Sequence, residues 1–184
     1  MRRSSFAFVL ASLAVCACGG AQRPYVAPGV QLWETEDHTS EGDVVVPGDP
    51  GANYAMVGDL QLWPKIFSDV ARVEAQGRDE ELGEDKVLLV TTEGQNNNLR
   101  FTNDPSRHVV RFHDTGGAAD VWAEISFEPA ARGMTRIHVK LHADVHGITS
   151  LFVTDAHLRH ERQKKLSSDL TDMQRFFNTA ARSP

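Results

Sequence analysis

The stretch that decides the fold is LFVTDAHLRHERQKKLSSDLTDMQRFFNTAA, residues 151–181. At the angular spacing of an α-helix its apolar side chains fall on one stripe, which predicts a single long amphipathic helix. Thr154 is a suitable N-cap, because its hydroxyl can accept a hydrogen bond from a free backbone N–H of the first turn. The stripe consists of Leu151, Leu158, Leu166, Leu170, Met173, Phe176, Phe177 and Ala180.

Three charged residues share the first half of this stripe: Asp155, Arg159 and Arg162. Asp155 and Arg159 are four residues apart, so they can form an ordinary surface ion pair worth a few tenths of a kcal/mol. Alternatively, one arginine lies at the mouth of a cavity and binds a carboxylate, phosphate or carbonyl oxygen of a ligand. We therefore expect residues 166–177 to anchor the helix and residues 155–162 to form the rim of any opening.

The N-terminus has the pattern of an export signal, with arginines at positions 2 and 3 before a short apolar run. This run is too short to remain as a membrane-spanning helix. The segment VCACG, residues 15–19, resembles the lipobox of bacterial lipoproteins, in which a cysteine that follows a small residue is lipidated. Cys18 fits this pattern better than Cys16, because Ala17 precedes it. We expect a signal peptide at 1–17, a lipidated tether at 18–29 and one domain at 30–184; a secretory signal without lipidation is the alternative.

The charge of the chain restricts its partners. The net charge is −6, and removal of residues 1–17 takes away two arginines and no acidic residue. Such an acidic domain is not suited to nucleic acid or to electrostatic attachment to anionic membranes. The lipoprotein resemblance instead implies an anchor in the bacterial cell envelope, and Gly19 after Cys18 favours the outer membrane, facing the periplasm. Both cysteines lie in the leader segment, so the mature domain has no disulfide.

The central part of the chain predicts a β-meander. PGDPG at 47–51 breaks the chain, and two short helices follow at 52–57 and 60–67, the second capped by Asp59. Beyond these helices, runs of period two alternate with polar loops and turns, including a loop at 77–85 and a turn at 94–97. The predicted strands are residues 30–46, 70–76, 86–93, 98–103, 107–114, 120–128 and 134–145.

The last of these strands shows the clearest alternation. Ile137, Val139, Leu141, Ala143 and Val145 fall on one face, and charged or histidine side chains fall on the other. A sheet with one apolar face needs a cover, and the C-terminal helix has the only large apolar surface left. We therefore predict one α+β domain. The apolar sheet face is expected to contain Val90, Leu99, Phe101, Val110, Phe112, Ile125, Phe127, Val139 and Leu141.

Two local segments carry a family resemblance: DLQLWPKIFSDV at 59–70, and FEP at 127–129 followed by GMTRI at 133–137. With the order of the elements, they resemble the START-like (SRPBCC) superfamily of polyketide cyclases, coenzyme-Q-binding START proteins and birch-pollen-allergen-type proteins. The resemblance covers about residues 30–181. It implies the helix-grip fold, a curved seven-stranded antiparallel sheet wrapped around a long C-terminal helix. It also implies a cavity for apolar ligands such as lipids, sterols, polyketides or isoprenoids.

Three functions are consistent with this resemblance. The first is a module that binds a hydrophobic small molecule. The second is a cyclase or dehydratase, for which Tyr54, Thr92, His108 and Arg162 are candidate polar groups, although they form no recognisable nucleophile–base set. The third is a structural envelope protein with a filled core. The predicted ligand-binding residues are Trp63, Phe67, Val90, Phe101, Phe112, Ile125, Leu158, Arg159, Arg162 and Leu166.

Eight histidines raise the question of a metal. His138 and His142 lie on one face of the last strand but about 13 Å apart, too far to share an ion, and His146 continues the same spacing. His157 and His160, with Glu161, are expected on the solvated side of the helix. We therefore expect no metal and no cofactor.

Overall fold

The computed structural model describes residues 28–35, 38–116, 119–145 and 154–182. The predicted signal peptide, with Cys16 and Cys18, lies outside the described residues. No helix within the described ranges is long and apolar enough to cross a membrane.

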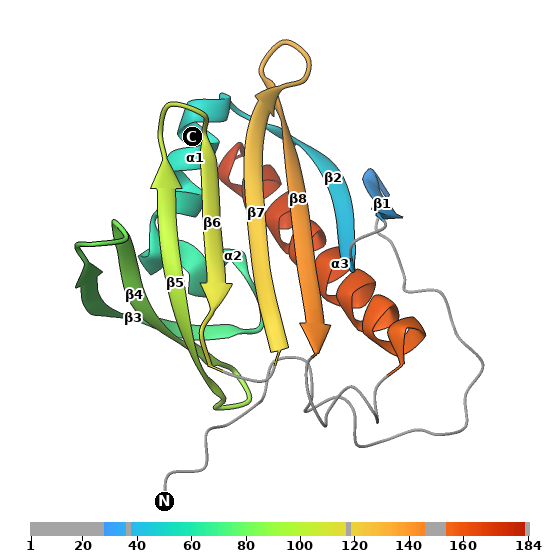
Figure 1. Ribbon diagram of the computed structural model, residues 1–184. Helices are drawn as coiled ribbons and strands as arrows, with labels where there is room; N and C mark the ends of the chain where they lie inside the picture. Colours follow the sequence, from blue (N-terminus) through green and yellow to red (C-terminus); the bar gives the residue numbers. More distant parts are fainter. Residues whose placement is uncertain (1–27, 36–37, 117–118, 146–153, 183–184) are drawn as a thin grey trace, which may run out of the picture.

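A single antiparallel sheet of eight strands forms most of the domain, in the order β1-β2-β8-β7-β6-β5-β4-β3 (Figure 1). Chain neighbours pair throughout, except where β2 pairs with β8. The strands are β1 (Val30–Glu34), β2 (Thr39–Pro47), β3 (Val70–Asp79), β4 (Glu84–Thr91), β5 (Asn96–Asp104), β6 (Val109–Asp114), β7 (Ala119–Pro129) and β8 (Met134–Val145).

The α+β fold class is confirmed, but the predicted count of seven strands is wrong. The segment predicted as one strand at 30–46 forms two, β1 and β2, which pair antiparallel with Val30 opposite Val44. Residues 35–38 contain neither Gly nor Pro, so the usual turn signal is absent from the sequence there. His38, just before β2, has a left-handed φ of 51°.

The predicted polar loop at 77–85 is also too long. β3 continues to Asp79 and β4 begins at Glu84. Charged side chains stabilise this hairpin by pairing across strands: Arg78 Nη1 lies 3.0 Å from Asp85 Oδ1, and Arg100 Nη1 lies 2.7 Å from Asp79 Oδ2. The polarity that suggested a loop therefore belongs to ion pairs, one within the β3–β4 hairpin and one that reaches across β4 to Arg100 of β5.

Two short helical segments connect β2 to β3, as predicted. They are α1 (Pro50–Gly58), followed by the 3-10 turn η2 (Leu60–Leu62) that runs into α2 (Trp63–Ile66). Asp49 Oδ1 caps α1 by accepting from the backbone N–H groups of Gly51 and Ala52, at 2.9 and 3.2 Å. Asp59 caps η2 by accepting from the N–H of Gln61 at 3.0 Å. α1 packs against β6, β7 and β8, and α2 packs against β3 and the C-terminal helix.

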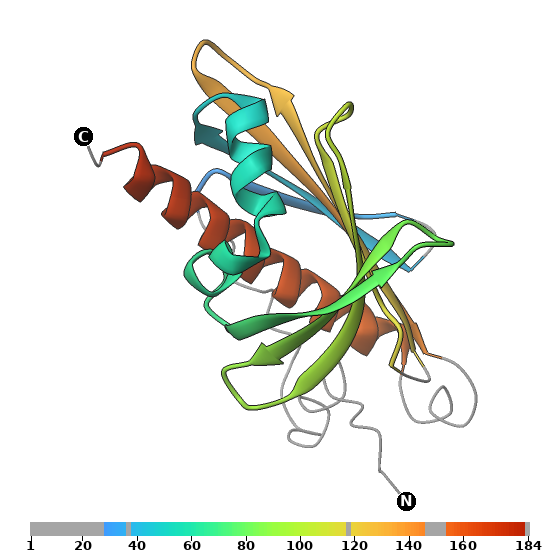
Figure 2. The same cartoon turned by 90° about the vertical axis from the view of Figure 1, so that its left-hand side faces the viewer.

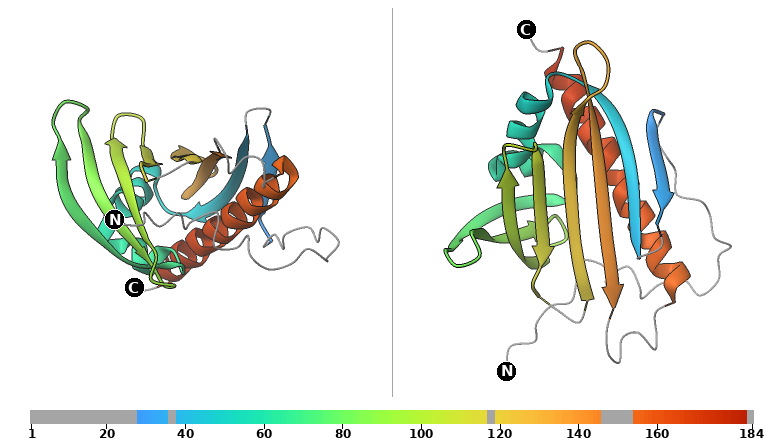
Figure 3. Two further views of the ribbon diagram at one scale, coloured as in Figure 1. Left: turned by 60° about the horizontal axis from the view of Figure 1, so that its bottom comes forward. Right: turned by 45° about the horizontal axis from the view of Figure 1, so that its top comes forward.

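The predicted long helix is α3 (Asp155–Ala180), which runs along the hollow side of the curved sheet (Figures 2 and 3). Thr154 is its N-cap, because its hydroxyl oxygen accepts from the N–H of His157 at 3.3 Å. The stripe is largely confirmed. Leu158, Leu166, Leu170, Met173 and Phe177 are at most 2% exposed, whereas Phe176 is partly buried and Ala180 is exposed. Leu151 lies outside the described residues.

α3 packs directly onto the backbone of β2. A Cβ atom added to Gly42 would lie 2.7 Å from Leu170 Cδ1 and 2.7 Å from Leu32 Cδ2. Only glycine leaves room for this close approach of helix and strand.

The predicted one-sided sheet is confirmed. Ile137, Val139, Leu141, Ala143 and Val145 of β8 are each at most 9% exposed. Of the predicted apolar sheet face, the buried core contains every residue except Val90 and Phe112, and Phe112 is partly buried and packs against it. The sheet therefore turns one apolar face towards α3, and the space between them is where the candidate site lies.

Candidate functional site: a cavity between the sheet and α3

A cavity of about 300 Å³ lies between α3 and the hollow face of the sheet. This volume is at the lower end of the range for small-molecule sites, roughly 300–1,000 Å³. Most of its wall is apolar and comes from β4 to β8, α2 and α3. Typical wall residues are Leu89, Leu99, Phe112, Ile125, Leu166 and Met173.

Trp63 forms a rigid aromatic part of the wall of this cavity. Its Nε1–H donates to the backbone oxygen of Val57 at 2.8 Å, which fixes the indole. Phe67, Phe101 and Phe112 meet the indole edge-on, with ring centroids 5.4, 5.8 and 5.7 Å away. Edge-to-face contacts of this kind hold aromatic rings in defined orientations. This wall is therefore preformed.

Six of the ten predicted ligand-binding residues line the cavity: Trp63, Phe67, Phe112, Ile125, Arg162 and Leu166. Of the others, Phe101 supports Trp63 from behind, and Leu158 is buried without lining the cavity. Val90 faces away, because its neighbour Leu89 lines the cavity and successive strand residues point to opposite faces. β4 is apolar on both faces, so its sequence did not indicate the correct register.

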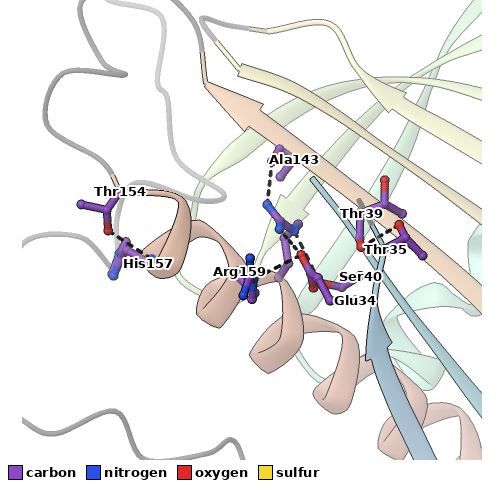
Figure 4. Close-up of polar contacts among 9 residues, drawn as sticks. Glu34, Thr35, Thr39, Ser40, Ala143, Thr154, His157 and Arg159 are labelled. Atoms are coloured by element: carbon purple, nitrogen blue, oxygen red, sulfur yellow. Dashed lines mark hydrogen bonds and ion pairs between the residues drawn. The ribbon is translucent and has the colours of Figure 1, made fainter. Parts of the chain in front are cut away.

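Arg162 is buried, and polar groups of three strands bind its guanidinium. Figure 4 labels these three partners, Glu34, Ser40 and Ala143. Its Nη1 donates to the backbone oxygen of Ala143 at 3.0 Å and its Nε to the hydroxyl of Ser40 at 3.4 Å. Its Nη2 forms an ion pair with Glu34 Oε1, and the Ser40 hydroxyl donates to Glu34 Oε2 at 2.5 Å. The charge of Arg162 is therefore already compensated within the protein.

Arg159 lies outside the cavity lining, with 58% of its side chain exposed. Its Nε is 3.8 Å from Glu34 Oε1, so its acidic neighbour is Glu34 and not Asp155. The cavity meets α3 from Glu161 to Met173, along the middle of the helix. The predicted division into a rim at 155–162 and an anchor at 166–177 therefore does not describe how α3 meets the cavity.

A charged cluster also lines the cavity: Asp69, immediately before β3, with Lys165 and Asp169 of α3. Lys165 Nζ is 3.1 Å from Asp69 Oδ2 and 2.5 Å from Asp169 Oδ1. The neighbouring backbone is fixed to the helix, because the N–H of Ser68 donates to Asp172 Oδ2 at 2.6 Å. The α2–β3 connection thus holds Asp69 next to the lysine.

The cluster shifts the pKa values of its members. Burial, together with the negative charges of Asp69 and Asp172, raises the pKa of Asp169 to about 6, although Lys165 opposes this. Burial alone would lower the pKa of Lys165, but the carboxylates of Asp169 and Asp69 more than compensate and raise it. Burial also raises the pKa of Asp114, which lines the same cavity.

Two buried polar atoms of the cavity lining have no hydrogen-bond partner within the described chain: Asp69 Oδ1 and Asn97 Nδ2. Asn97 is 5% exposed and belongs to β5. Its cross-strand partner on β4 is Leu89, and both Leu89 and Leu99 line the cavity. Asn97 belongs to the segment predicted as a turn at 94–97, so it was not among the predicted site residues. The sequence spacing could have indicated its position, because Asn97 lies two residues before Leu99 and alternate residues of a strand share one face.

The four candidate catalytic residues do not come together. Thr92 and Arg162 line the cavity. Tyr54 and His108 pack on each other elsewhere, with ring centroids 5.5 Å apart, and Tyr54 also contacts Phe127. Burial raises the pKa of Tyr54, and Asp104 adds to this rise.

The described residues contain no group of three or more His, Cys, Asp or Glu side chains placed to hold a metal ion. His138 instead contacts two carboxylates, with Nδ1 2.7 Å from Asp43 and Nε2 3.2 Å from Glu41. His157, His160 and Glu161 were expected on the solvated side of the helix. The structure corrects this expectation, since all three are half-buried and Glu161 lines the cavity.

Comparison with known proteins identifies the fold. No protein-family model and no curated protein matches the sequence, but solved structures superpose on it. A START superfamily protein from Mycobacterium smegmatis gives a TM-score of 0.64 at 14% identity, with 78% of this chain and 99% of that one covered. The chain has the START-like helix-grip fold.

Two further structures share this START-like fold. The di-domain aromatase/cyclase BexL of the BE-7585A biosynthetic pathway gives a TM-score of 0.68 at 16% identity over 79% of this chain. The match spans 48% of BexL, about half of its length. The lipid transfer and protein localization domain of human StarD13 gives 0.54 at 12% identity, covering 81% of this chain and 89% of that domain.

The buried pair of Glu34 and Arg162 leads to a stability prediction. Glu34→Gln should lower the free energy of unfolding by about 3 kcal/mol, because it leaves the buried Arg162 without a counter-charge. The double variant Glu34→Leu/Arg162→Met should lose much less, since it removes both charges. Urea denaturation of the three proteins measures the difference. Equal losses in both variants would contradict the description of the pair.

The raised pKa of Asp169 leads to a prediction about pH. The folded state holds this proton up to about pH 6, whereas the unfolded state releases it near pH 4. The group therefore adds stability at low pH, and this contribution is lost as the pH rises from 4 through 6. Relative to Asp169→Asn, the natural protein should gain roughly 2–3 kcal/mol between pH 7 and pH 4.

Urea denaturation of both proteins across this pH range measures the effect. Asp155→Asn, which removes an exposed carboxylate from the same helix, controls for the loss of one charge. A stability difference between the natural protein and Asp169→Asn that does not change with pH would show that Asp169 is not perturbed.

Proposed function

We propose that this protein binds a hydrophobic small molecule in the cavity between the sheet and α3. The observation that carries the proposal is the apolar-walled cavity of about 300 Å³ in the core of the domain. A structural protein with a filled core would not leave this space, because protein interiors are otherwise closely packed. Each 100 Å² of ligand surface buried there contributes about 2.5 kcal/mol before the costs of association.

The comparisons support this proposal at the level of fold. Among proteins with the same fold are a lipid transfer domain and an aromatase/cyclase. One fold serves many functions, so the argument for binding rests on the cavity of this chain.

A cyclase-type or dehydratase-type enzyme is the second candidate. It is favoured by Asp169, a cavity-lining carboxyl with a pKa of about 6, since a group that titrates near neutral pH is suited to general acid–base chemistry. Binding is the better-supported function, because Tyr54 and His108 lie outside the cavity. Turnover of a bound compound that is lost in Asp169→Asn, with binding retained, would favour the enzyme.

We further propose that the domain is attached to the bacterial envelope through a lipid on Cys18, facing the periplasm from the outer membrane. The support is the sequence alone, namely the signal-peptide pattern and the lipobox-like VCACG at 15–19. With a net charge of −6, the chain gains little from electrostatic attraction to anionic lipids, so a covalent lipid would supply the attachment.

Mass spectrometry of the protein purified from its natural membranes tests ligand binding. We expect an apolar compound at close to one per protein chain after solvent extraction. Ala123→Leu should reduce this amount several-fold, because Ala123 is 2% exposed and lines the cavity, so the larger side chain fills it. Ala75→Leu, at an exposed position of β3, is the matched control. No compound in the natural protein, or no difference between the variants, would overturn the proposal.

Cell fractionation tests the anchor. Cys18→Ala should move the protein from the membrane to the soluble fraction, while Cys16→Ala should leave it in the membrane. Retention of Cys18→Ala in the membrane would show that Cys18 is not the anchor. Release by Cys16→Ala alone would assign the lipid to the other cysteine.

A further inference from the structure

The polar side chains of the cavity restrict what kind of ligand it takes. Five carboxyl residues and three basic residues line it, so the lining has an excess of acid. The basic residues are Arg162, Lys164 and Lys165.

Each of these cations already faces a carboxylate of the protein. Arg162 pairs with Glu34, and Lys165 lies between Asp69 and Asp169. Lys164 Nζ is 4.0 Å from Glu161 Oε2. An anionic ligand that bound Arg162 or Lys165 would therefore have to displace an existing ion pair while it approached the remaining carboxylates, whereas Lys164 is 61% exposed and its head lies towards solvent. Both steps oppose its binding.

The remaining carboxylates of the lining have uncharged partners. Glu93 accepts from the amide of Gln95 at 3.4 Å, and Asp114 accepts from the N–H of Gly116 at 2.8 Å. Glu93 and Asp114 therefore add negative charge to the lining, and neither forms an ion pair with a basic residue of the described chain. The lining is thus electrostatically matched to a ligand without negative charge.

Asn97 supplies the group that such a ligand would meet. Its Nδ2 is a buried donor with no partner in the described part of the chain, and its side chain belongs to the cavity lining. A buried amide without a partner costs free energy. Asparagine is also disfavoured in strands, and Asn97 is the second residue of β5. An apolar side chain would serve a filled core better, so the position is explained by a hydrogen bond to something that enters the cavity.

We propose that the cavity selects ligands with an apolar body and an uncharged oxygen head, a hydroxyl or a carbonyl, that accepts a hydrogen bond from Asn97 Nδ2. This inference rests on the proposed function and makes it more specific. Fatty-acid-like carboxylates and phosphorylated lipids are the ligands it excludes. Alcohols, ketones and esters share the chemistry that it selects.

The test uses four small probes with the purified protein, stripped of bound compounds on a hydrophobic resin. They are 1-octanol, 2-octanone, octanoate and propylbenzene, titrated at pH 7.5 while the methyl NMR signals of the cavity wall are followed. Propylbenzene has no polar head, so it reports on the apolar cavity alone. We expect 1-octanol and 2-octanone to bind at least tenfold more tightly than octanoate.

Asn97→Leu should weaken 1-octanol and 2-octanone about fivefold through loss of the hydrogen bond, and leave propylbenzene unchanged or tighter. It should also raise the unfolding temperature, because it removes the unpaired buried donor. Asn98→Leu is the matched control, since Asn98 is the next residue of β5 and is exposed. Asn97→Ala provides a second test of the same hydrogen bond if the leucine variant does not fold.

Two results would overturn the inference while leaving the proposed function intact. One is octanoate binding as tightly as 1-octanol. The other is an Asn97→Leu protein that binds 1-octanol and 2-octanone as the natural protein does. Absence of propylbenzene binding to the natural protein would overturn the proposed function itself, and the inference with it.

Discussion

The structure depends on one contact, the packing of the apolar stripe of α3 against the hollow face of the sheet. The strands pair along the whole sheet, with β1 and β3 at its two edges. The sheet nevertheless has one large apolar face that water would otherwise cover. Leu166, Leu170 and Met173 are fully buried there, and Gly42 lets the helix approach the backbone of β2. α3 packs closely on β2, whereas a gap separates it from β4 to β7, and this gap is the cavity.

The ion pair of Glu34 and Arg162 adds a charged interaction between the sheet and α3. It joins the edge strand β1 to the N-terminal third of α3, with Ser40 and the backbone of Ala143 completing the hydrogen bonds. A buried pair of this kind is a weak source of stability, but it penalises arrangements that separate its partners. It also neutralises the arginine that would otherwise attract an anionic ligand. The same interaction therefore affects both the position of β1 and the chemistry of the cavity.

Much of the fold could be predicted because periodicity is a local property of the sequence. The limits of α3, its N-cap at Thr154 and the buried face of β8 all follow from short-range spacing. The division of 30–47 into two strands was missed because no glycine or proline marks it, and Val90 was misassigned because both faces of β4 are apolar. Six predicted ligand-binding residues line the cavity, but their binding role stays a prediction. The polar part of the lining was missed because Asp69, Asn97 and Lys165 are distant in sequence and only the folded chain brings them to one cavity.

The central claim is that the space between α3 and the sheet is open to an apolar molecule. A crystal structure of the protein under xenon pressure tests this most directly, because xenon enters apolar cavities whatever the natural ligand is. We predict strong density, from xenon or from a retained ligand, beside Phe112, Ile125, Leu166 and Met173. Side chains that fill this space, with no density between them, would contradict the account.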